Sequence, residues 1–484
     1  MKNLFKSALF LVCIFSFIQC EKEITIPENI VVQDFIWKSL NAYYLYQDQI
    51  PDLADRRFNS DQELNNYLNG FADNQVLFNG LLIPTDENSN LILDYTNLNI
   101  NLPRTAFTNG MEFIAIEQPN NTDNIIGIVS HILPNSNASN KNIRRGEFFN
   151  SVNGTILTKT NFENLLITNT NPFNLGMVNF DGVNITANGK VVSLEKENYN
   201  YPTALIEKTF ALGAANIGYL LFANDFSENS IEELNNTFLA FKNQAVNELI
   251  LDLRYSISGS ETETNIAYLA ALITGQFAAE PLIKKEWNAK AQRWFLDNEP
   301  EALVTNFPTQ IAERGNLNSL NLNNVYLILN GENFDGSSGI ELLINSLKPY
   351  INVEIIGTNT AGNPNGILTL YNSEDYNFAN RNTTHTIATQ PTVLTFTNNN
   401  DQSFIDGFTP NITTCTNEDI LNLGELGERT EPILDRVLTY ISTGNSGVNF
   451  NCNPNNYEFI YNSLDAQRLL DNGVLITQNL PNTN

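Results

Sequence analysis

The chain has 484 residues, enough for about three domains, and 42% of them are hydrophobic, which is enough for a sizeable core. It carries 53 acidic against 26 basic side chains, a formal net charge of −27 at pH 7. Such a surface repels phosphate groups and anionic lipid heads. We therefore exclude nucleic acid as a partner.

The first residues have the features of an export signal. Lys2 and Lys6 precede a short apolar run over residues 9–18, which ends at Phe17-Ile18-Gln19-Cys20. The run is too short to span a bilayer comfortably, since that takes about 20 apolar residues. A cysteine at the cleavage site resembles a bacterial lipobox, so we predict a signal peptide over residues 1–19 and a lipid anchor on Cys20. A plain cleaved signal with an incidental cysteine is the alternative.

This anchor predicts a cell-envelope lipoprotein that faces either the periplasm or the outer surface. Cleavage removes Lys2 and Lys6 and no acidic residue, which leaves 24 basic against 53 acidic side chains and a net charge of −29. Cys13 leaves with the signal, so Cys415 and Cys452 remain, either as a disulfide or as two thiols. No Cys/His spacing typical of zinc sites occurs, and we expect no metal and no cofactor.

Residues 20–102 are expected to form a lipid-anchored linker followed by a helical N-terminal region. Apolar side chains recur at helical spacing between Val31 and Tyr44. Ser60-Asp61-Gln62-Glu63 is a capping box, which predicts the start of a second helix extending to Phe71.

Residues 103–197 change to short alternating strands. Ile126 to Leu133 predicts a strand, and Arg144 to Gly154 predicts a hairpin because it combines a glycine turn, an apolar strand and a tight Asn-Gly turn. This segment resembles a PDZ domain, a module that binds extended chain ends by adding them to a sheet edge. The resemblance implies a carboxylate-binding loop at Gly110, Met111, Glu112 and Phe113. A small β-domain without a ligand is the alternative.

Residues 198–442 alternate strands and helices, which predicts an α/β domain with a mixed sheet flanked by helices. The capping box Ser230-Ile231-Glu232-Glu233 predicts one helix and residues 264–274 another. Strands are expected at 217–222, 248–253, 325–329 and 353–356. Residues 443–484 are rich in Asn and Gly, and we expect a C-terminal extension made of a loop and a short added helix.

A candidate nucleophile follows the third of these strands. In Asp335-Gly336-Ser337-Ser338-Gly339-Ile340-Glu341, Ser338 stands at a strand-to-helix turn. Its hydroxyl would lie beside the first backbone N–H groups of the helix, which can stabilise an oxyanion. The motif alone is weak evidence, because Ser and Gly are common at helix caps.

Four segments resemble the tail-specific, or C-terminal-processing, serine peptidases. They are Arg144 to Gly154, Leu251-Asp252-Leu253-Arg254-Tyr255, Ser338-Gly339-Ile340-Glu341 and Gly407-Phe408-Thr409-Pro410-Asn411. The resemblance implies a helical front, a PDZ domain and an α/β catalytic domain, with Ser338 as the nucleophile.

The resemblance also implies a Ser–Lys dyad, in which a desolvated lysine takes the serine proton. That lysine follows a Thr-x-Gly segment, but here Thr360-Ala361-Gly362 is followed by Asn363, whose amide accepts no proton at neutral pH. The glycine-rich oxyanion turn of the family is altered too, because Ile257 is β-branched. Gly259, together with Gly339 at the helix start, remains as the candidate oxyanion region.

We therefore expect a protein that binds extended peptides or unfolded protein C-termini and cleaves them weakly or not at all. Loss of a general base removes a factor of about 100 to 10,000 in rate, and loss of an oxyanion donor removes about as much again. Two alternatives stay open. One is an active serine endopeptidase that uses another base, such as His131 or His385, and the other is a purely structural interaction lipoprotein.

Overall fold

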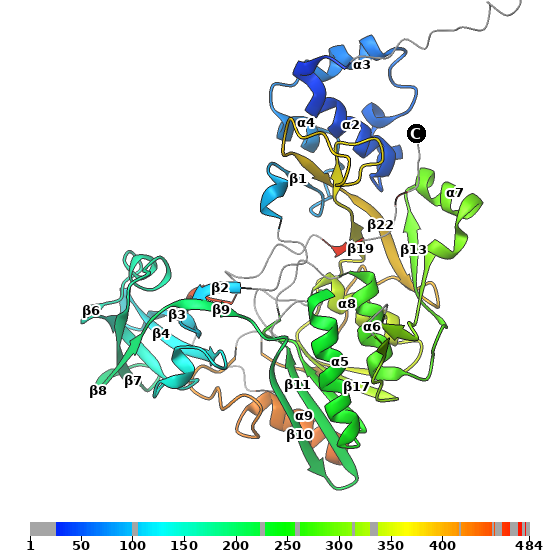
Figure 1. Cartoon of the computed structure of the whole chain (residues 1–484). Helices are drawn as coiled ribbons and strands as arrows, with labels where there is room; N and C mark the ends of the chain where they lie inside the picture. Colours follow the sequence, from blue (N-terminus) through cyan, green and yellow to red (C-terminus); the bar gives the residue numbers. More distant parts are fainter. Residues whose placement is uncertain are drawn as a thin grey trace, which may run out of the picture.

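The computed structural model describes residues 26–98, 105–222, 228–256, 262–311, 315–329, 337–415, 418–447, 450, 457–464, 473–476 and 480. The expected signal peptide, Cys20, Gly259 and Cys452 lie outside the described residues. Figure 1 shows N-terminal helices at one end, a layered α/β region at the other, and a β-rich lobe that projects to one side. The mixed α/β fold expected from the sequence is confirmed.

The N-terminal region forms the helices α2 (Val31–Tyr43), α3 (Asp61–Leu68) and α4 (Asn74–Gly80). Helix α3 begins after Ser60, whose hydroxyl accepts the backbone N–H of Glu63 at 3.3 Å, as the capping box predicts. These helices share one hydrophobic core with the α/β region. The amide of Asn288 ties the two together by donating to the carbonyl oxygens of Ala42 at 2.9 Å and Tyr44 at 3.2 Å.

The β-lobe, residues 105–200, contains a seven-stranded sheet in the order β24-β3-β4-β5-β7-β8, with β6 paired to β5. Asn153 and Gly154, both at positive φ, form the tight turn between β5 and β6 that the Asn-Gly pair predicts. The strand β24 (Phe459–Asn462) comes from the C-terminal extension. The lobe's own strands are β2 (Thr105–Thr108), β3 (Met111–Gln118), β4 (Asn121–Ile132), β5 (Phe148–Val152), β6 (Thr155–Ile156), β7 (Phe173–Phe180), β8 (Ile185–Leu194) and β9 (Glu197–Asn200), of which β2 and β9 pair separately.

The α/β region is built on a six-stranded sheet in the order β10-β11-β12-β17-β18-β23, in which only β10 is antiparallel to its neighbour. Helices α5 (Glu228–Asn243), α6 (Glu263–Thr274) and α8 (Ser338–Leu347) cover one face, and α9 (Pro432–Thr443) covers the other (Figure 1). The strands are β10 (Ala204–Leu212), β11 (Ala215–Phe222), β12 (Glu248–Asp252), β17 (Asn324–Leu329), β18 (Asn352–Gly357) and β23 (Ile412–Thr413).

A five-stranded sheet in the order β14-β13-β22-β19-β25 is not among the elements expected from the sequence. It joins β13 (Pro281–Trp287), β14 (Val304–Asn306), β19 (Asn365–Ile367), β22 (Thr392–Asn398) and β25 (Val474–Leu475). Nearby lie helix α7 (Ala289–Asn298) and the short strands β1 (Asn90–Ile92), β15 (Gln310–Ile311), β16 (Gly315–Asn316), β20 (Leu370–Tyr371) and β21 (Ala388–Gln390).

The C-terminal extension differs from its expected form. Its described parts, residues 457–464 and 473–476, contribute the strands β24 and β25, so the expected loop with a short helix is wrong for these parts. The physical reason is that β3 and β19 would otherwise present a row of unpaired backbone groups, which these two segments satisfy.

Candidate active site

Two helices begin at the same edge of the six-stranded sheet. Strands β12 and β17 pair in parallel, so their carboxyl ends lie side by side. Helix α6 is the next described element after β12, helix α8 is the next described element after β17, and the two helices contact each other. The first turns of α6 and α8 therefore lie at this edge of the sheet. In α/β proteins this edge usually carries the ligand-binding and catalytic groups.

Ser338 is the first residue of α8. The preceding Ser337 caps the helix, because its hydroxyl accepts the backbone N–H of Ile340 at 3.1 Å. Ser338 is buried, with 1% of its surface exposed, and Gly339 is buried beside it. Groups at this position face the positive end of the helix dipole, which favours a developing oxyanion.

Glu341 lies one turn further along α8, on the same face as Ser338. Its carboxylate is fully buried and accepts two consecutive backbone N–H groups, that of Gly362 at 2.7 Å and that of Asn363 at 2.8 Å. Three residues of helix rise only about 4.5 Å. Glu341 therefore ties the backbone of Asn363, the position at which the resemblance places the general base, to the first turn of the helix that begins with Ser338.

The side chain of Asn363 is engaged with other asparagines. Its Nδ2 donates to Oδ1 of Asn88 at 2.9 Å, and its Oδ1 accepts from Nδ2 of Asn365 at 2.9 Å. Asn88 comes from the segment that follows the N-terminal helices, 275 residues away in the sequence. An amide with these contacts is held in place, and it has no lone pair that takes up a proton at neutral pH.

The Thr360-Ala361-Gly362 segment packs against Gly407-Phe408, part of one of the four segments that carry the family resemblance. The backbone N–H of Thr360 donates to the carbonyl of Phe408 at 3.0 Å, and the N–H of Phe408 donates to Oγ1 of Thr360 at 2.8 Å. Gly362 and Gly407 both adopt positive φ. A Cβ on Gly407 would lie 2.1 Å from the carbonyl oxygen of Thr360, so glycine is required at this crossing.

Arg254, from the Leu-Asp-Leu-Arg segment, is the centre of a buried ion cluster. Its guanidinium lies 2.7 Å from Asp252 and 2.6 Å from Glu418. It also contacts Glu431 at 3.2 Å, and this carboxylate caps α9 by accepting the N–H groups at the start of that helix. The cluster fixes the turn that follows β12 to the start of α9.

Arg145 extends the ion cluster into the β-lobe. Its Nη2 binds Glu418 at 2.6 Å, and its Nη1 donates to the hydroxyl of Tyr255 at 2.7 Å. Burial alone would raise the pKa of Glu418, but the charges of Arg145 and Arg254 outweigh burial and hold it below its ordinary value of 4.5. Two of the four resembling segments, those of Arg145 and Arg254, thus share one carboxylate.

A buried lysine–glutamate pair lies at the start of α6, and no sequence motif indicates it. Lys285 on β13 and Glu263, the first residue of α6, are both buried, with Nζ and Oε1 3.8 Å apart. Burial lowers the pKa of Lys285 and raises that of Glu263, while each partner's charge opposes the shift of the other. The pair shares the edge of the sheet at which α8 also begins.

The two histidines that the sequence offers as alternative bases, His131 and His385, both contact neighbouring groups of the chain. The His131 ring is buried and packs edge-on against Tyr255, with 4.7 Å between ring centres. The His385 ring accepts the backbone N–H of Ile387 at Nδ1, 3.2 Å away, and burial lowers its pKa. Lys348 follows the last residue of α8, about 15 Å along the helix axis from Ser338, and its amine lies 4.5 Å from the ring centre of Phe408.

The four residues of the expected carboxylate-binding loop, Gly110 to Phe113, are all buried. Three of their backbone N–H groups have partners within the chain. The N–H of Gly110 donates to Thr108 Oγ1 at 3.1 Å, and that of Met111 donates to Asn109 Oδ1 at 2.9 Å. The N–H of Phe113 donates to Ser463 of the C-terminal extension at 2.8 Å.

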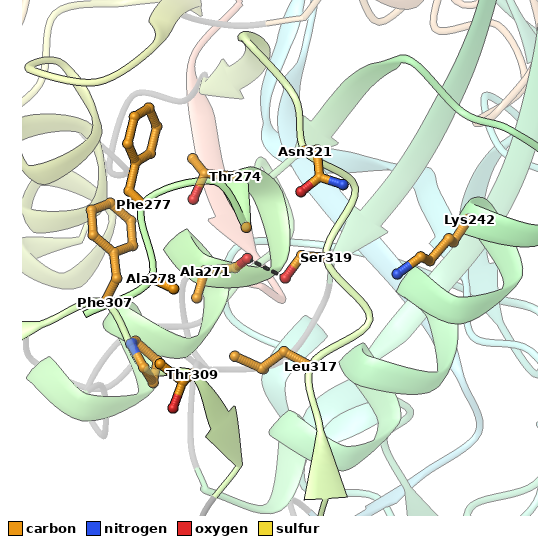
Figure 2. A pocket seen from close by; sticks show the side chains of 12 residues that line it. Lys242, Ala271, Thr274, Phe277, Ala278, Phe307, Thr309, Leu317, Ser319 and Asn321 are labelled. Carbon is orange, nitrogen blue, oxygen red and sulfur yellow. Dashed lines mark hydrogen bonds between the residues drawn. The ribbon is translucent and has the colours of Figure 1, made fainter. Parts of the chain in front are cut away.

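A cavity of about 220 Å³ lies at the far end of α6, lined by Thr274 at the end of that helix, Phe277, Phe307 and Ser319 (Figure 2). The hydroxyl of Ser319 donates a hydrogen bond to the carbonyl oxygen of Ala271 at 2.6 Å. Helix α6 has 12 residues and so separates this cavity from the Ser338 edge by roughly 18 Å. The cavity is no part of the candidate active site.

Cys415 is disulfide-bonded, which decides between the two forms that the sequence left open for this residue. Cys452, the partner that the sequence suggests, lies outside the described residues. Within the described ranges, no group of three or more His, Cys, Asp or Glu side chains could hold a metal ion. No helix in the described part of the chain has the length and apolarity needed to cross a membrane.

Comparisons with known proteins give a family domain and a fold. The model of the peptidase S41 N-terminal domain matches residues 31–95. The crystal structure of a candidate S41 protease from Bacteroides fragilis NCTC 9343 superposes with a TM-score of 0.63 at 19% sequence identity, over 85% of this chain and 97% of that one. The photosystem II D1 C-terminal processing protease matches with a TM-score of 0.44 at 14% identity, over 86% and 98% of the two chains. No curated protein sequence matches this chain.

The N-terminal family domain and the shared fold confirm the resemblance to the S41, tail-specific peptidases. The site contains residues that sequence reasoning found and residues that it missed. Ser338, Glu341 and Asn363 lie together at the expected edge. Asn88 and the Lys285–Glu263 pair were missed, because nothing in their local sequence distinguishes them from ordinary loop, strand and helix positions.

Proposed function

We propose that this protein resembles a tail-specific peptidase in fold but binds extended polypeptide segments, including protein C-termini, and cleaves them weakly or not at all. The observation that carries the proposal is the side chain of Asn363, an amide at the position of the general base that is engaged by Asn88 and Asn365. Ser338 and the buried carboxylate of Glu341 are both present at this edge, and an amide stands where the resemblance places the lysine of the dyad.

The proposal that the protein binds polypeptide segments is supported by the outer edge of β3, which pairs with an added strand. A sheet edge binds an extended segment through main-chain hydrogen bonds, and this mode needs no catalytic group. Strand β3 already binds one such segment, β24, in antiparallel register. The β-lobe is therefore the part of the molecule that we propose to be PDZ-like.

We further propose that the protein is a lipoprotein of the cell envelope, anchored through Cys20 and facing the periplasm or the outer surface. The support is the N-terminal sequence and the disulfide at Cys415, since disulfides persist in oxidising compartments. Metabolic labelling with a fatty-acid analogue tests the anchor. Label on the wild type and none on Cys20→Ala is expected, and an unlabelled wild type would refute it.

An active peptidase with another base is the second candidate, and Lys285 favours it. A lysine that acts as a general base needs a desolvated environment that lowers its pKa. Lys285 has such an environment beside Glu263, at the sheet edge where α8 begins. Ser338 would then keep a proton acceptor that the sequence did not indicate.

Digestion of unfolded casein separates the two candidates. We expect the wild type and Ser338→Ala to be equally slow, and Asn363→Lys to be faster by up to about 100-fold because it restores the missing base. Asn365→Lys is the matched control, which adds the same charge two residues away and should stay at the wild-type rate. Wild-type turnover that disappears in Ser338→Ala would overturn the proposal, and its loss in Lys285→Met would identify the second candidate.

A further inference from the structure

The edge of the β-lobe sheet is closed by the chain's own C-terminal extension. Strand β24 runs antiparallel to β3, with Phe459 opposite Ile116 and Asn462 opposite Ile114. At one end, Ser463 and Phe113 exchange two bonds: the N–H of Ser463 donates to the Phe113 carbonyl at 3.0 Å, and the N–H of Phe113 donates to the Ser463 hydroxyl at 2.8 Å. At the other end, the N–H of Glu117 donates to the carbonyl of Glu458 at 2.8 Å. The main-chain groups that β3 would offer to a peptide are therefore in use.

The side chains of the segment also pack against aromatic residues of the lobe beside this edge. The ring of Tyr461 lies 5.3 Å from that of Phe113 on β3 and 5.7 Å from that of Phe162. Phe162 immediately precedes the helical turn η7 (Glu163–Ile167), so Tyr461 sits between strand and helix, as the anchor of an added strand does. Tyr457 contacts the lobe separately, donating from its hydroxyl to the carbonyl of Gly182 at 3.0 Å.

The β-lobe does not depend on this segment for its own core. On the face of the sheet that carries Phe113, the buried side chains all come from residues 111–194, and Ile460 and Tyr461 pack only at the margin of that cluster. On the other face, Tyr457 and Phe459 likewise pack at the margin of a cluster whose buried members come from the lobe and from Ile420 and Leu423. All four residues of β24 are half-buried. A strand that is short, half-exposed and peripheral to the core can leave without dismantling the domain it covers.

We propose that residues 457–464 are an intramolecular ligand of β3, and that an extended polypeptide partner binds the β-lobe by replacing them. The inference rests on the proposed function, because it names the edge at which binding takes place and its resting occupant. The partner that fits is an extended segment of about eight residues that runs antiparallel to β3 and carries an aromatic side chain at the position of Tyr461.

Tethering makes this internal ligand hard to displace. The segment follows α9, and the next described stretch of the extension is anchored again, where Val474 of β25 pairs with Gly366 and the N–H of Ile476 donates to the Ile367 carbonyl at 2.9 Å. A segment held at both ends acts at an effective concentration in the millimolar range. A free peptide of equal intrinsic affinity at micromolar concentration therefore does not displace the segment from β3.

The test measures binding of a fluorescent synthetic octapeptide, Tyr-Glu-Phe-Ile-Tyr-Asn-Ser-Leu, which has the sequence of residues 457–464, to the full chain by anisotropy. The double variant Tyr461→Ser/Ser463→Pro removes the anchor ring and the N–H donor of the internal segment. We expect it to bind the octapeptide at least about tenfold more tightly than the wild type does. Tyr440→Ser, which removes a tyrosine from α9 outside the lobe, is the matched control and should behave as the wild type. Equal affinities in all three proteins would overturn the inference.

Hydrogen exchange gives a second readout that does not depend on the peptide. The N–H groups of Phe113 and Glu117 should exchange faster in the double variant and become protected again when the octapeptide is added. If the double variant does not fold, Ser463→Ala, which removes only the hydroxyl acceptor, should shift both readouts in the same direction by a smaller factor. Unchanged exchange in a folded variant would contradict the inference.

Foreign peptides with free apolar C-termini distinguish this inference from the proposed function. If they bind neither protein while the octapeptide binds the double variant, the internal ligand stands and the proposed binding of chain ends fails. If they bind the wild type as tightly as the double variant, the proposed function stands and the internal ligand is refuted.

Discussion

Replacing Glu341 with glutamine is expected to loosen the loop that carries Asn363. Each carboxylate oxygen of this buried side chain accepts one backbone N–H, from Gly362 at 2.7 Å and from Asn363 at 2.8 Å. Glutamine keeps the shape but turns an NH₂ group toward one of these donors, so one charge-assisted hydrogen bond is lost and a buried N–H is left unpaired. Such losses cost about 2–4 kcal/mol in the free energy of unfolding.

Urea unfolding followed by intrinsic fluorescence measures this cost. Glu286→Gln is the matched control, because Glu286 is exposed on β13 and its replacement should change stability by less than about 0.5 kcal/mol. Hydrogen exchange at the N–H groups of Gly362 and Asn363 reports the same effect locally, and about 2–4 kcal/mol corresponds to roughly 30- to 700-fold faster exchange. A stability loss below about 1 kcal/mol with unchanged exchange would refute the role of Glu341.

Three further outcomes follow from the ion cluster and the glycine crossing. Arg145→Met removes one of the two cations that contact Glu418 and should lower the free energy of unfolding in urea by about 3–5 kcal/mol. A decrease under about 1 kcal/mol would contradict this role. The pKa of Glu418 lies below 4.5 in the folded chain, so its stabilisation is complete above about pH 4.5 and disappears as the pH falls through the folded pKa. The Tm of Glu418→Gln should therefore fall less between pH 7 and 3 than that of the wild type. Parallel curves of Tm against pH for the two proteins would show that the carboxylate of Glu418 does not cause the loss of stability in acid. Gly407→Ala places a Cβ 2.1 Å from a carbonyl oxygen at φ +67°, whereas Gly213→Ala at φ +63° meets nothing within 4 Å. Calorimetry should find a loss above about 3 kcal/mol for Gly407→Ala and about 1 kcal/mol for Gly213→Ala, and equal losses would contradict the close approach.

The sequence predicts those elements whose signals are local. The buried strands β12, β17 and β18 are short apolar runs, and their bounds agree with the expected ranges to within a residue or so. Two similar capping boxes had different outcomes. Ser60 caps α3, whereas Ser230 lies inside α5, which begins at Glu228, and Glu233 instead accepts the N–H of Thr203 at 3.1 Å. A tertiary contact that joins positions 30 residues apart decides the second case, and a tetrapeptide pattern cannot contain it.

The five-stranded sheet could not be predicted from the sequence either, because contacts between distant segments decide it. Strand β13 carries the adjacent lysines Lys284 and Lys285, which argue against a buried strand, and β19 and β25 are only a few residues long. Lys285 becomes tolerable because Glu263 lies beside it in the folded chain. Strand β13 pairs with β22, and this pairing joins segments more than 100 residues apart.

The candidate site was predictable where motif and topology coincide. Ser338 lies at a helix start because a capping serine precedes an apolar run at helical spacing, and both are visible in the sequence. The contacts that hold Asn363 were not visible, since Asn88 reaches it from the segment after the N-terminal helices. The occupant of the β3 edge was hidden as well, because β24 is an unremarkable run of mixed residues in an Asn-rich tail.

Our central proposal is that Ser338 is not activated as a nucleophile, because position 363 holds an amide and not an amine. An activated serine reacts irreversibly with a fluorophosphonate, and intact-mass analysis counts the label on each chain. We predict that the wild type and Ser338→Ala take up the same background amount over hours. Stoichiometric labelling of the wild type that is absent from Ser338→Ala would contradict the account.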